Sequence, residues 1–259
     1  YMGGGTPTTL SAAQMDCVLS HLEQYFDMGY LQEYTVEAGR PDSITREKLE
    51  VLYKHHVGRI SINPQTMQQK TLDLIGRRHT VGETVQAFKL AREIGFDNIN
   101  MDLIAGLPEE TPADMADTLR QIENLKPDSL TVHALAMKHG SRLSRERAEA
   151  AVRPNYKQMA AELEEMIRMA SDSARNMGLQ PYYLYRQKNM AGNFENVGYA
   201  KVDKAGIYNI LIMEEKQSIV AAGAGASTKI VLPYEIPAPG SKNGRTTNLI
   251  RIENVRDVN

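Results

Sequence analysis

Short runs in the first half of the chain alternate apolar and polar residues, and amphipathic stretches separate these runs. The alternating runs lie near residues 31–38, 58–63, 97–104 and 129–137. A period of two is typical of a β-strand, and strands that alternate with helices form parallel sheets with crossover helices. The pattern therefore predicts an α/β fold.

Apolar residues between the strands recur every three to four positions, which predicts helices with one buried face. One such set is Leu10, Met15, Val18, Leu22 and Phe26. A second set is Val81, Val85, Phe88, Ala91 and Ile94. A third, after Pro154, is Met159, Leu163, Met166, Ile167, Ala170, Ala174 and Met177. Thr80 with Glu83 predicts a capping box, and Thr111 before Pro112 predicts another helix start.

The character of the chain changes after Gly178. The aromatic run Tyr182–Tyr185 comes first, a polar stretch rich in Asn and Gly follows, and a Pro-rich segment lies near 233–239. We therefore predict two domains. Residues 1–179 are expected to form a partial, open (β/α) barrel, and residues 180–259 a small C-terminal extension.

One face of the predicted sheet is polar, although buried parallel strands usually read as continuous apolar runs. The polar positions are Thr35, Glu37, Arg59, Ser61, Asn63, Asn98, Asn100 and Asp102. Unpaired polar groups are costly to bury, so this face is expected to line a site that accepts hydrogen bonds or charge. A solvated face of an open α/β sheet is the alternative explanation.

A glycine triplet, Gly3–Gly5, stands near the start of the sequence and is followed by Thr6 and Pro7. Glycine tolerates positive φ and lets other groups approach the backbone closely, so its amides and carbonyls can engage a polar ligand. A glycine triplet alone fits an ordinary turn equally well.

Composition narrows the classes of partner. The 259 residues carry 30 Lys and Arg against 32 Asp and Glu, a net charge of -2, so no overall basic field favours nucleic acid and a small molecule is expected. The single cysteine, Cys17, excludes a disulfide framework or a thiolate-held metal within these residues and fits a reducing cytoplasm. No apolar run approaches the roughly 20 residues that span a bilayer.

Five motifs, taken together, favour a ligand-binding role for the glycine triplet over an ordinary turn. They are Gly3–Pro7, Thr35–Glu37, Arg59–Gln65, Arg77–Thr80 and Asn100–Pro108. In order and spacing over residues 1–140 the chain closely resembles the radical S-adenosylmethionine (SAM) enzymes of the oxygen-independent coproporphyrinogen III oxidase family. The segments Tyr182–Asn189 and Asn196–Tyr199 resemble the HemZ-type branch of that family.

The resemblance implies a SAM site, residue by residue. Gly4, Gly5 and Thr6 would hold the amino group of the methionine moiety, and Glu37 falls at the family's cofactor-binding carboxylate. Three further positions would contact the ribose and the carboxylate of SAM; they are Gln65, Arg77 and Asp102. Ala136 would lie beside the adenine. An arginine suits a bidentate carboxylate contact, whereas neighbouring Arg78 reads as a solvated side chain.

Substrate contacts are expected in the second half of the chain. A porphyrinogen carries carboxylates, and Arg186 and Lys188 are candidates to bind them. Tyr182–Tyr185 could form a flat amphipathic wall. A final strand with the tyrosine tips at the surface is the alternative for this run.

The resemblance also implies a four-iron, four-sulfur (4Fe-4S) cluster held by a CxxxCxxC motif upstream of the glycine turn. We therefore expect a sequence truncated at its N-terminal side, with no metal ligands of its own and no activity alone. The intact protein would be a cytoplasmic oxidoreductase of haem biosynthesis. With an electron donor such as flavodoxin or ferredoxin, it would use a SAM-derived radical to convert coproporphyrinogen III to protoporphyrinogen IX by oxidative decarboxylation.

Two other functions stay open. A haem-binding chaperone is built on the same scaffold, and its family carries a His-Asn…Tyr-Trp signature. This chain has no tryptophan, and Asn196–Tyr199 is at most a remnant of that signature. The second alternative is a radical SAM enzyme that acts on another substrate, because one scaffold hosts many reactions.

Overall fold

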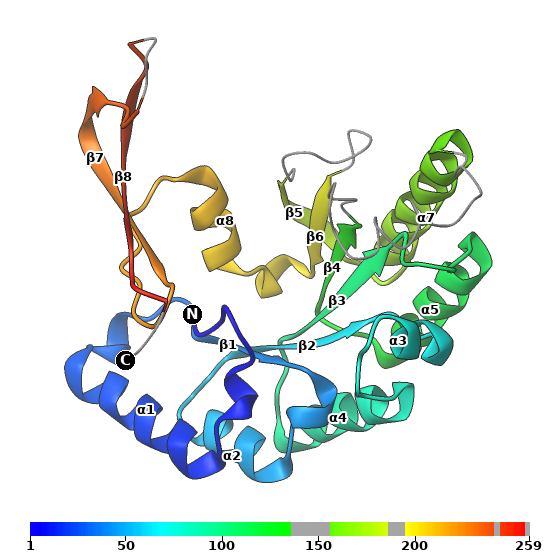
Figure 1. The fold of residues 1–259 in the computed structure, drawn as a ribbon. Coiled ribbons are helices and arrows are strands. Elements are labelled where there is room, and N and C mark those ends of the chain that lie inside the picture. Colours follow the sequence, from blue (N-terminus) through cyan, green and yellow to red (C-terminus); the bar gives the residue numbers. More distant parts are fainter. Residues whose placement is uncertain (136–155, 186–194, 241–243, 257–259) are drawn as a thin grey trace. The chain divides into compact units, whose positions relative to one another are not determined.

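A computed structural model describes residues 1–135, 156–185, 195–240 and 244–256 of the chain (Figure 1). The chain forms two compact units, Tyr1–Ala205 and Gly206–Asn259. Each unit has its own sheet. None of the helices in the described ranges is long and apolar enough to cross a membrane.

The first unit is built on a mixed sheet whose described strands run in the order β1-β2-β3-β4-β6-β5. Their bounds are β1 (Thr35–Gly39), β2 (Arg59–Gln65), β3 (Ile99–Ala105), β4 (Ser129–Ala134), β5 (Gln180–Tyr185) and β6 (Asn196–Ala200). The first four are parallel, and β6 pairs antiparallel with both β4 and β5. The predicted α/β fold with a parallel sheet is therefore confirmed.

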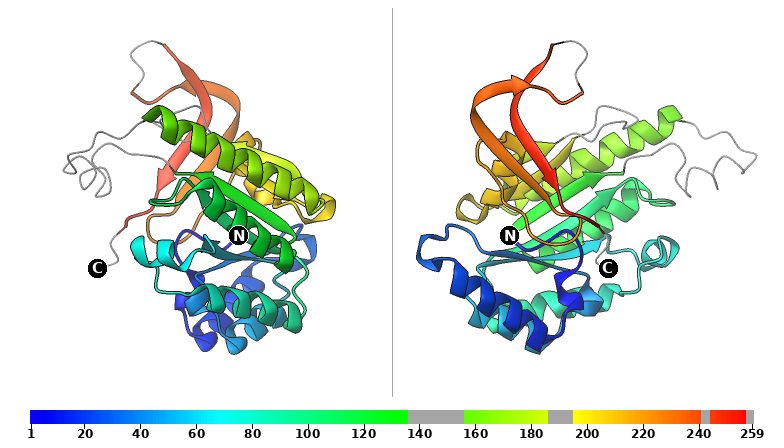
Figure 2. Two further views of the ribbon diagram at one scale, coloured as in Figure 1. Left: turned by 90° about the vertical axis from the view of Figure 1, so that its right-hand side faces the viewer. Right: turned by 60° about the vertical axis from the view of Figure 1, so that its left-hand side comes forward.

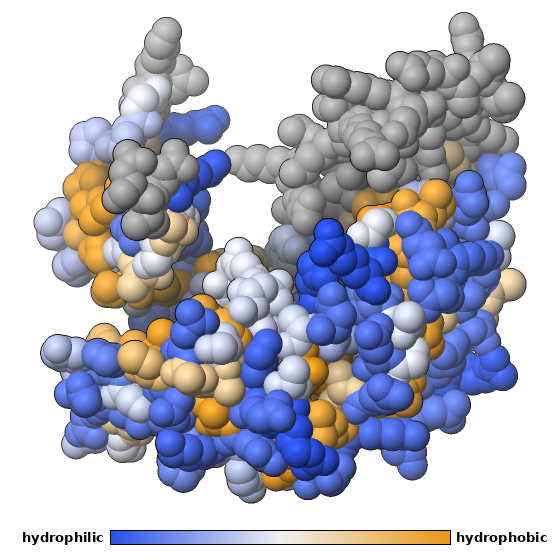
Figure 3. Space-filling model, turned by 60° about the horizontal axis from the view of Figure 1, so that its bottom comes forward, coloured by the Kyte–Doolittle hydropathy of each residue, from blue (hydrophilic) through white to orange (hydrophobic). Residues whose placement is uncertain are grey.

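Helices cover one face of this sheet, as the views in Figures 1 and 2 agree. The α-helices of the first unit are α1 (Ala12–Tyr25), α2 (Arg46–Lys54), α3 (Gln69–Leu74), α4 (Val81–Ile94), α5 (Pro112–Leu125) and α7 (Tyr156–Asn176). Short 3-10 turns occupy Pro7–Thr9, Met28–Tyr30, Pro41–Ser43 and Val202–Lys204. The face drawn in Figure 3 is largely hydrophilic, with apolar residues scattered among the polar ones.

Local signals explain where the crossover helices start and stop. Both predicted helix starts are confirmed, because Thr80 and Thr111 each form a capping box. At its other end, α4 stops at Gly95, which has a φ of 119°. A residue with a Cβ is strained in that left-handed conformation, so glycine is suited to this helix end.

The apolar sides of the strands pack against the helices and form the core. The fully buried members on the four parallel strands include Val36, Ala38, Ile60, Ile62, Ile99, Met101, Leu103 and Leu130. The predicted faces of α4 and α7 also join this core. The predicted face of α1 is partly wrong, because Leu19 is buried whereas Val18 and Phe26 are 39% and 65% exposed.

The sheet continues past the boundary expected at residue 179. Strand β5 begins at Gln180, and the first unit closes only after Ala205. The physical reason is the antiparallel ladder: β6 returns to lie between β4 and β5, which adds residues 180–185 and 196–200 to the sheet of the first unit. The second compact unit starts at Gly206.

The second unit contains one helix and one hairpin within its described residues. The helix is α8 (Ile207–Glu214), and the hairpin joins β7 (Ser227–Pro237) to β8 (Thr246–Glu253). Glu215 follows the helix and accepts hydrogen bonds from Lys229 on β7 and Arg251 on β8, each at 3.2 Å. These contacts join the helix to both strands.

An aromatic ring approaches the backbone of β6 so closely at Gly198 that only glycine fits there. A Cβ built at this position would lie 1.9 Å from Cε1 of Tyr183, which is its partner on β5. The Tyr183 ring therefore lies directly over the glycine and covers its backbone. Aromatic rings that cover a cross-strand glycine stabilise such sheets.

We predict that Gly198→Ala lowers the free energy of unfolding by about 1–3 kcal/mol, because the tyrosine ring must move away from the added methyl group. Chemical denaturation measures this change. Gly58→Ala is the matched control, since a Cβ there would meet nothing within 4 Å. Equal effects of the two substitutions would show that the ring does not depend on Gly198.

Candidate cofactor site

The face of the sheet opposite the helices carries a continuous set of polar side chains. Those that are at least 91% buried are Thr35, Arg59, Ser61, Asn100, Ser129 and Thr131. Some of their polar atoms have no hydrogen-bond partner among the described residues; these atoms are Arg59 Nε and Ser61 Oγ, together with Asn63 Oδ1. Buried unpaired atoms are costly, so they mark a surface that is suited to a polar ligand.

The glycine loop lies at the edge of this face. Met2 pairs in parallel with Val36, since its amide donates to Thr35 O at 2.8 Å and its carbonyl accepts from the Glu37 amide at 2.9 Å. A Cβ at Gly3 would lie 2.7 Å from the carboxyl carbon of Glu37. The backbone at Gly3 therefore packs directly on the Glu37 side chain, as only a glycine allows.

The next residues of the loop are open on their outer side. Gly4 has a φ of 87°, which favours glycine. A Cβ at Gly4 or Gly5 would meet nothing within 4 Å. Thr6 lies against the end of β1, with its Cγ2 3.3 Å from the position of a Cβ on Gly39. The loop thus presents exposed backbone beside Glu37.

The Tyr1 hydroxyl connects Glu37 to the middle of the polar face. It donates a hydrogen bond to the Glu37 carboxylate. Burial raises the pKa of Tyr1, and the charges of Glu37 and Asp102 raise it further, whereas Arg59 lowers it. The charges of Glu37, Arg59 and Asp102 thus all act on this hydroxyl. Glu37 on β1 and Asp102 on β3 therefore belong to one electrostatic site around Tyr1.

Asp102 is fixed by a polar neighbour on its own strand. Asn100 Nδ2 donates to Asp102 Oδ1 at 2.6 Å, and Thr131 on β4 donates to Asn100 Oδ1 at 3.2 Å. Asn100 was predicted on this face from alternation, but its role in orienting Asp102 was not. Local alternation places a side chain on a face and does not reveal its hydrogen-bond partners.

Two further predicted residues lie at the carboxyl ends of their elements. Gln65 ends β2 with a φ of 69° and is 8% exposed. Arg77 is half-buried after α3, and burial, together with the charge of Arg40, lowers its pKa while Asp42 raises it. Because Arg40 directly follows Gly39, this places Arg77 near the same end of β1 as the glycine loop. No hydrogen bond or ion pair within the described ranges joins Gln65 or Arg77 to Glu37 or Asp102.

The predicted tyrosine run forms strand β5, and its rings are half-buried rather than free at the surface. The Tyr183 and Tyr185 rings stack with centroids 6.4 Å apart and planes 2° apart. The Tyr185 hydroxyl lies 3.3 Å from Nδ1 of His133 on β4. Sequence reasoning missed His133 because the pair depends on long-range strand order. Ala136, Arg186 and Lys188 lie outside the described residues.

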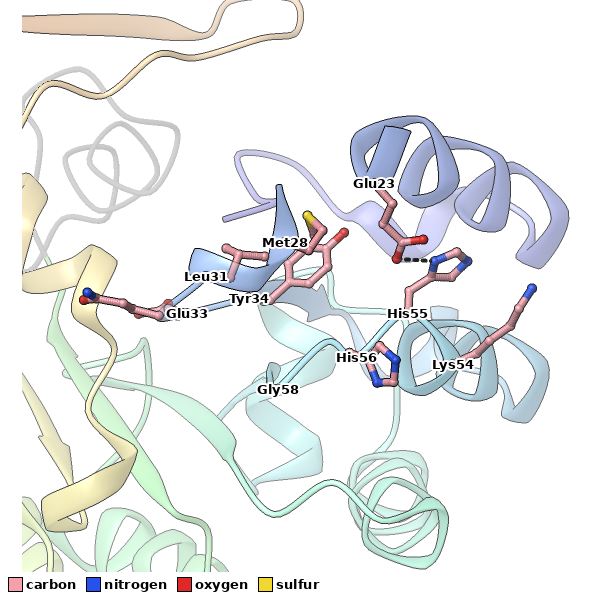
Figure 4. Close-up of a pocket in the computed structure, with 10 residues that line it drawn as sticks. Glu23, Met28, Leu31, Glu33, Tyr34, Lys54, His55, His56 and Gly58 are labelled. Atoms are coloured by element: carbon pink, nitrogen blue, oxygen red, sulfur yellow. Dashed lines mark hydrogen bonds and ion pairs between the residues drawn. The ribbon is translucent and has the colours of Figure 1, made fainter. Parts of the chain in front are cut away.

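A separate pocket of about 590 Å³ lies at the amino ends of β1 and β2, away from the glycine loop (Figure 4). It is lined by Glu23, Met28, Leu31, Gln32, Glu33, Tyr34, Lys54, His55, His56 and Gly58. Ligands of α/β proteins bind at the carboxyl ends of the strands. The polar face with its glycine loop, and not this pocket, is therefore the candidate cofactor site.

His55 beside this pocket clamps α2 to α1. It is 5% exposed, and its ring nitrogens lie 2.7 Å from Glu23 Oε1 and 2.9 Å from Asp16 Oδ1. Burial alone lowers the pKa of His55, but the two carboxylates outweigh burial and raise it overall. The histidine thus joins the two helices through one carboxylate near each end of α1.

Comparison with known proteins assigns the fold to a class. Residues 1–122 match the model of the radical SAM superfamily. The chain also aligns with the E. coli coproporphyrinogen III oxidase structure, described as a radical SAM enzyme, with a TM-score of 0.68 over 87% of this chain and 51% of that one. At 23% identity this likeness concerns the fold. Residues 1–122 thus form a radical SAM domain.

Its relatives narrow the family further. It is 47% identical over 235 residues to the oxygen-independent coproporphyrinogen-III oxidase-like protein HemZ of Bacillus subtilis, covering 89% of this chain and 45% of that protein. It is 35% identical over 136 residues to heme chaperone HemW of the same organism, covering 52% and 36%. The chain is thus a relative of the HemZ type, and it spans less than half the length of either protein.

Radical SAM proteins use SAM and a 4Fe-4S cluster, and the two groups fit these residues differently. The unpaired atoms of Ser61 and Asn63 and the open backbone at Gly4 and Gly5 fit a polar ligand such as SAM. The single cysteine, Cys17, is exposed on α1. One thiol does not supply the thiolates of a cluster, so these 259 residues do not fit the iron group.

We predict that the His55 clamp makes stability depend on pH. Because the pKa of His55 is higher in the folded chain, its contribution is complete below the unfolded value of about 6.5 and is lost as pH rises through the folded value. The free energy of unfolding of the wild type, measured by chemical denaturation, should therefore fall above neutral pH by more than that of His55→Gln. Parallel pH profiles of the two proteins would contradict this assignment.

Proposed function

We propose that the polar face of the first unit binds SAM. The observation that carries this proposal is the packing of the glycine loop on Glu37, within one electrostatic site that also contains Asp102. Gly4, Gly5 and Thr6 hold the amino group of the methionine moiety, and Glu37 contacts it as the nearby carboxylate. Gln65, Arg77 and Asp102 take the ribose hydroxyls and the carboxylate, and Ala136 lies by the adenine.

The role of these residues is to bind and orient SAM. Bound SAM supplies the radical chemistry that defines the superfamily. The chain's carboxylates and amides fix the ligand by directional hydrogen bonds, and the buried setting strengthens each of them. Positioning of reacting groups contributes a large part of catalysis by enzymes that rely on cofactors.

We propose coproporphyrinogen III as the substrate of the whole protein, which converts it to protoporphyrinogen IX by oxidative decarboxylation. Support comes from the identity of 47% to the oxidase-like HemZ. The stacked rings of Tyr183 and Tyr185 lie on the same sheet as the cofactor site and offer a flat wall for a tetrapyrrole. Arg186 and Lys188 follow this wall in sequence and bind the substrate carboxylates.

The proposal includes the partners of the whole protein. A 4Fe-4S cluster is held by residues outside this sequence, and a flavodoxin or ferredoxin delivers electrons in the cytoplasm. A sequence without the cluster ligands is inactive alone.

A haem chaperone is the second candidate function. The identity of 35% to heme chaperone HemW over 136 residues supports it. The same tyrosine wall would then bind haem without turnover. A radical SAM enzyme with a different substrate remains the third candidate, since one scaffold serves many reactions.

Mass spectrometry of reaction products tests the proposed activity. The full-length protein is reconstituted anaerobically with iron and sulfide and then given reductant, SAM and coproporphyrinogen III. Loss of two carboxyl groups from the substrate, together with 5′-deoxyadenosine, is the expected result. Intact tetrapyrrole with tight haem binding in a titration would favour the chaperone instead.

We predict that Asp102→Ala and Arg77→Ala each weaken SAM binding at least about tenfold, because hydrogen bonds to charged groups contribute about 1.5–3 kcal/mol. Isothermal titration calorimetry of the reconstituted protein without reductant measures the dissociation constant. Arg78→Ala is the control, since Arg78 is exposed beside Arg77. If all three variants bind SAM equally, the site assignment is wrong.

A further inference from the structure

Four residues from four strands lie in one row across the sheet. Asp102 on β3 is the register partner of Thr131 on β4, Thr131 is the partner of Gly198 on β6, and Gly198 is the partner of Tyr183 on β5. Neighbouring strands are about 4.8 Å apart. The row therefore leads from a candidate cofactor residue to the tyrosine wall.

The absence of a side chain at Gly198 leaves room for the Tyr183 ring above β6. Because a Cβ at this position would meet the Tyr183 ring at 1.9 Å, the ring occupies the space above β6 that a side chain would fill. Gly198 is itself the register partner of Thr131, so the ring covers the backbone beside that threonine.

Thr131 continues the row toward the cofactor site. It is 3% exposed and donates to Asn100 Oδ1 at 3.2 Å. Asn100 is 4% exposed, and its amide nitrogen donates to Asp102 Oδ1 at 2.6 Å. With its oxygen engaged by Thr131, the Asn100 side chain is held with its NH₂ group toward the carboxylate. Thr131 thus fixes which end of the Asn100 amide faces Asp102, and Asn100 in turn fixes the carboxylate.

We infer that Thr131 and Asn100 are positioning residues for the Asp102 carboxylate. The inference rests on the proposed function in one respect, the contact of Asp102 with SAM. It goes beyond that function because it makes the affinity for SAM depend on the Thr131 hydroxyl of β4, which does not touch the cofactor.

Substitutions that remove only a hydroxyl group test the inference. Thr131→Val keeps the shape of the side chain but cannot donate to Asn100. In anaerobic calorimetry of the full-length, cluster-loaded protein without reductant, it should weaken SAM binding about three- to tenfold. Thr131→Ser restores the hydroxyl and should return the affinity to within about twofold of wild type. Rescue by serine separates positioning from a general packing effect.

A control variant at a second buried threonine separates a loss of stability from a loss of affinity. Thr84→Val is the matched control, because the buried Thr84 on α4 donates only to Thr80 O at 3.3 Å within its own helix. It should change thermal stability without changing the affinity for SAM.

The outcomes distinguish this inference from the proposed function. If Asp102→Ala weakens SAM binding while Thr131→Val binds SAM as the wild type does, the inference is overturned and the proposed site stands. If Asp102→Ala itself binds SAM normally, the contact and the inference fall together. Equal losses in Thr131→Val and Thr131→Ser would also overturn it.

Discussion

Polar side chains buried on one face of a parallel sheet need hydrogen-bond partners, and this need organises the first unit. The opposite, apolar face is covered by α1, α2, α4, α5 and α7 and forms the core. On the polar face, Asn100, Asp102 and Thr131 satisfy one another, whereas Ser61 and Asn63 keep unpaired atoms. A sheet that tolerates such atoms gives up stability in exchange for a surface suited to a ligand.

The glycine loop and the tyrosine wall depend on the same principle, which is close approach of a side chain to a backbone without a Cβ. Gly3 admits the Glu37 carboxylate at one side of the sheet, and Gly198 admits the Tyr183 ring at the other. Both glycines therefore shape the polar face from its edges. The His55 clamp, by contrast, belongs to the packing of α1 on α2 and lies at the amino ends of the strands.

Local patterns predicted much of this fold, because strand alternation and capping residues are local. The four parallel strands and the starts of α4 and α5 were predicted from such signals. Long-range pairing was not: β6 returns between β4 and β5, and the first compact unit extends to Ala205. The polar face was predicted by alternation, but the Asn100 contact and the partnership of Tyr185 with His133 depend on strand order, which no local pattern contains.

Amide hydrogen exchange of the full-length protein, with and without SAM, tests the central claim most directly. The account predicts that SAM slows exchange in the glycine loop at residues 3–6 and at the ends of the strands near 37–39, 63–66 and 102–106. Exchange near residues 28–34 and 55–58, around the separate pocket, should stay unchanged. Protection confined to that pocket, with none in the glycine loop, would contradict the placement of the cofactor on the polar face.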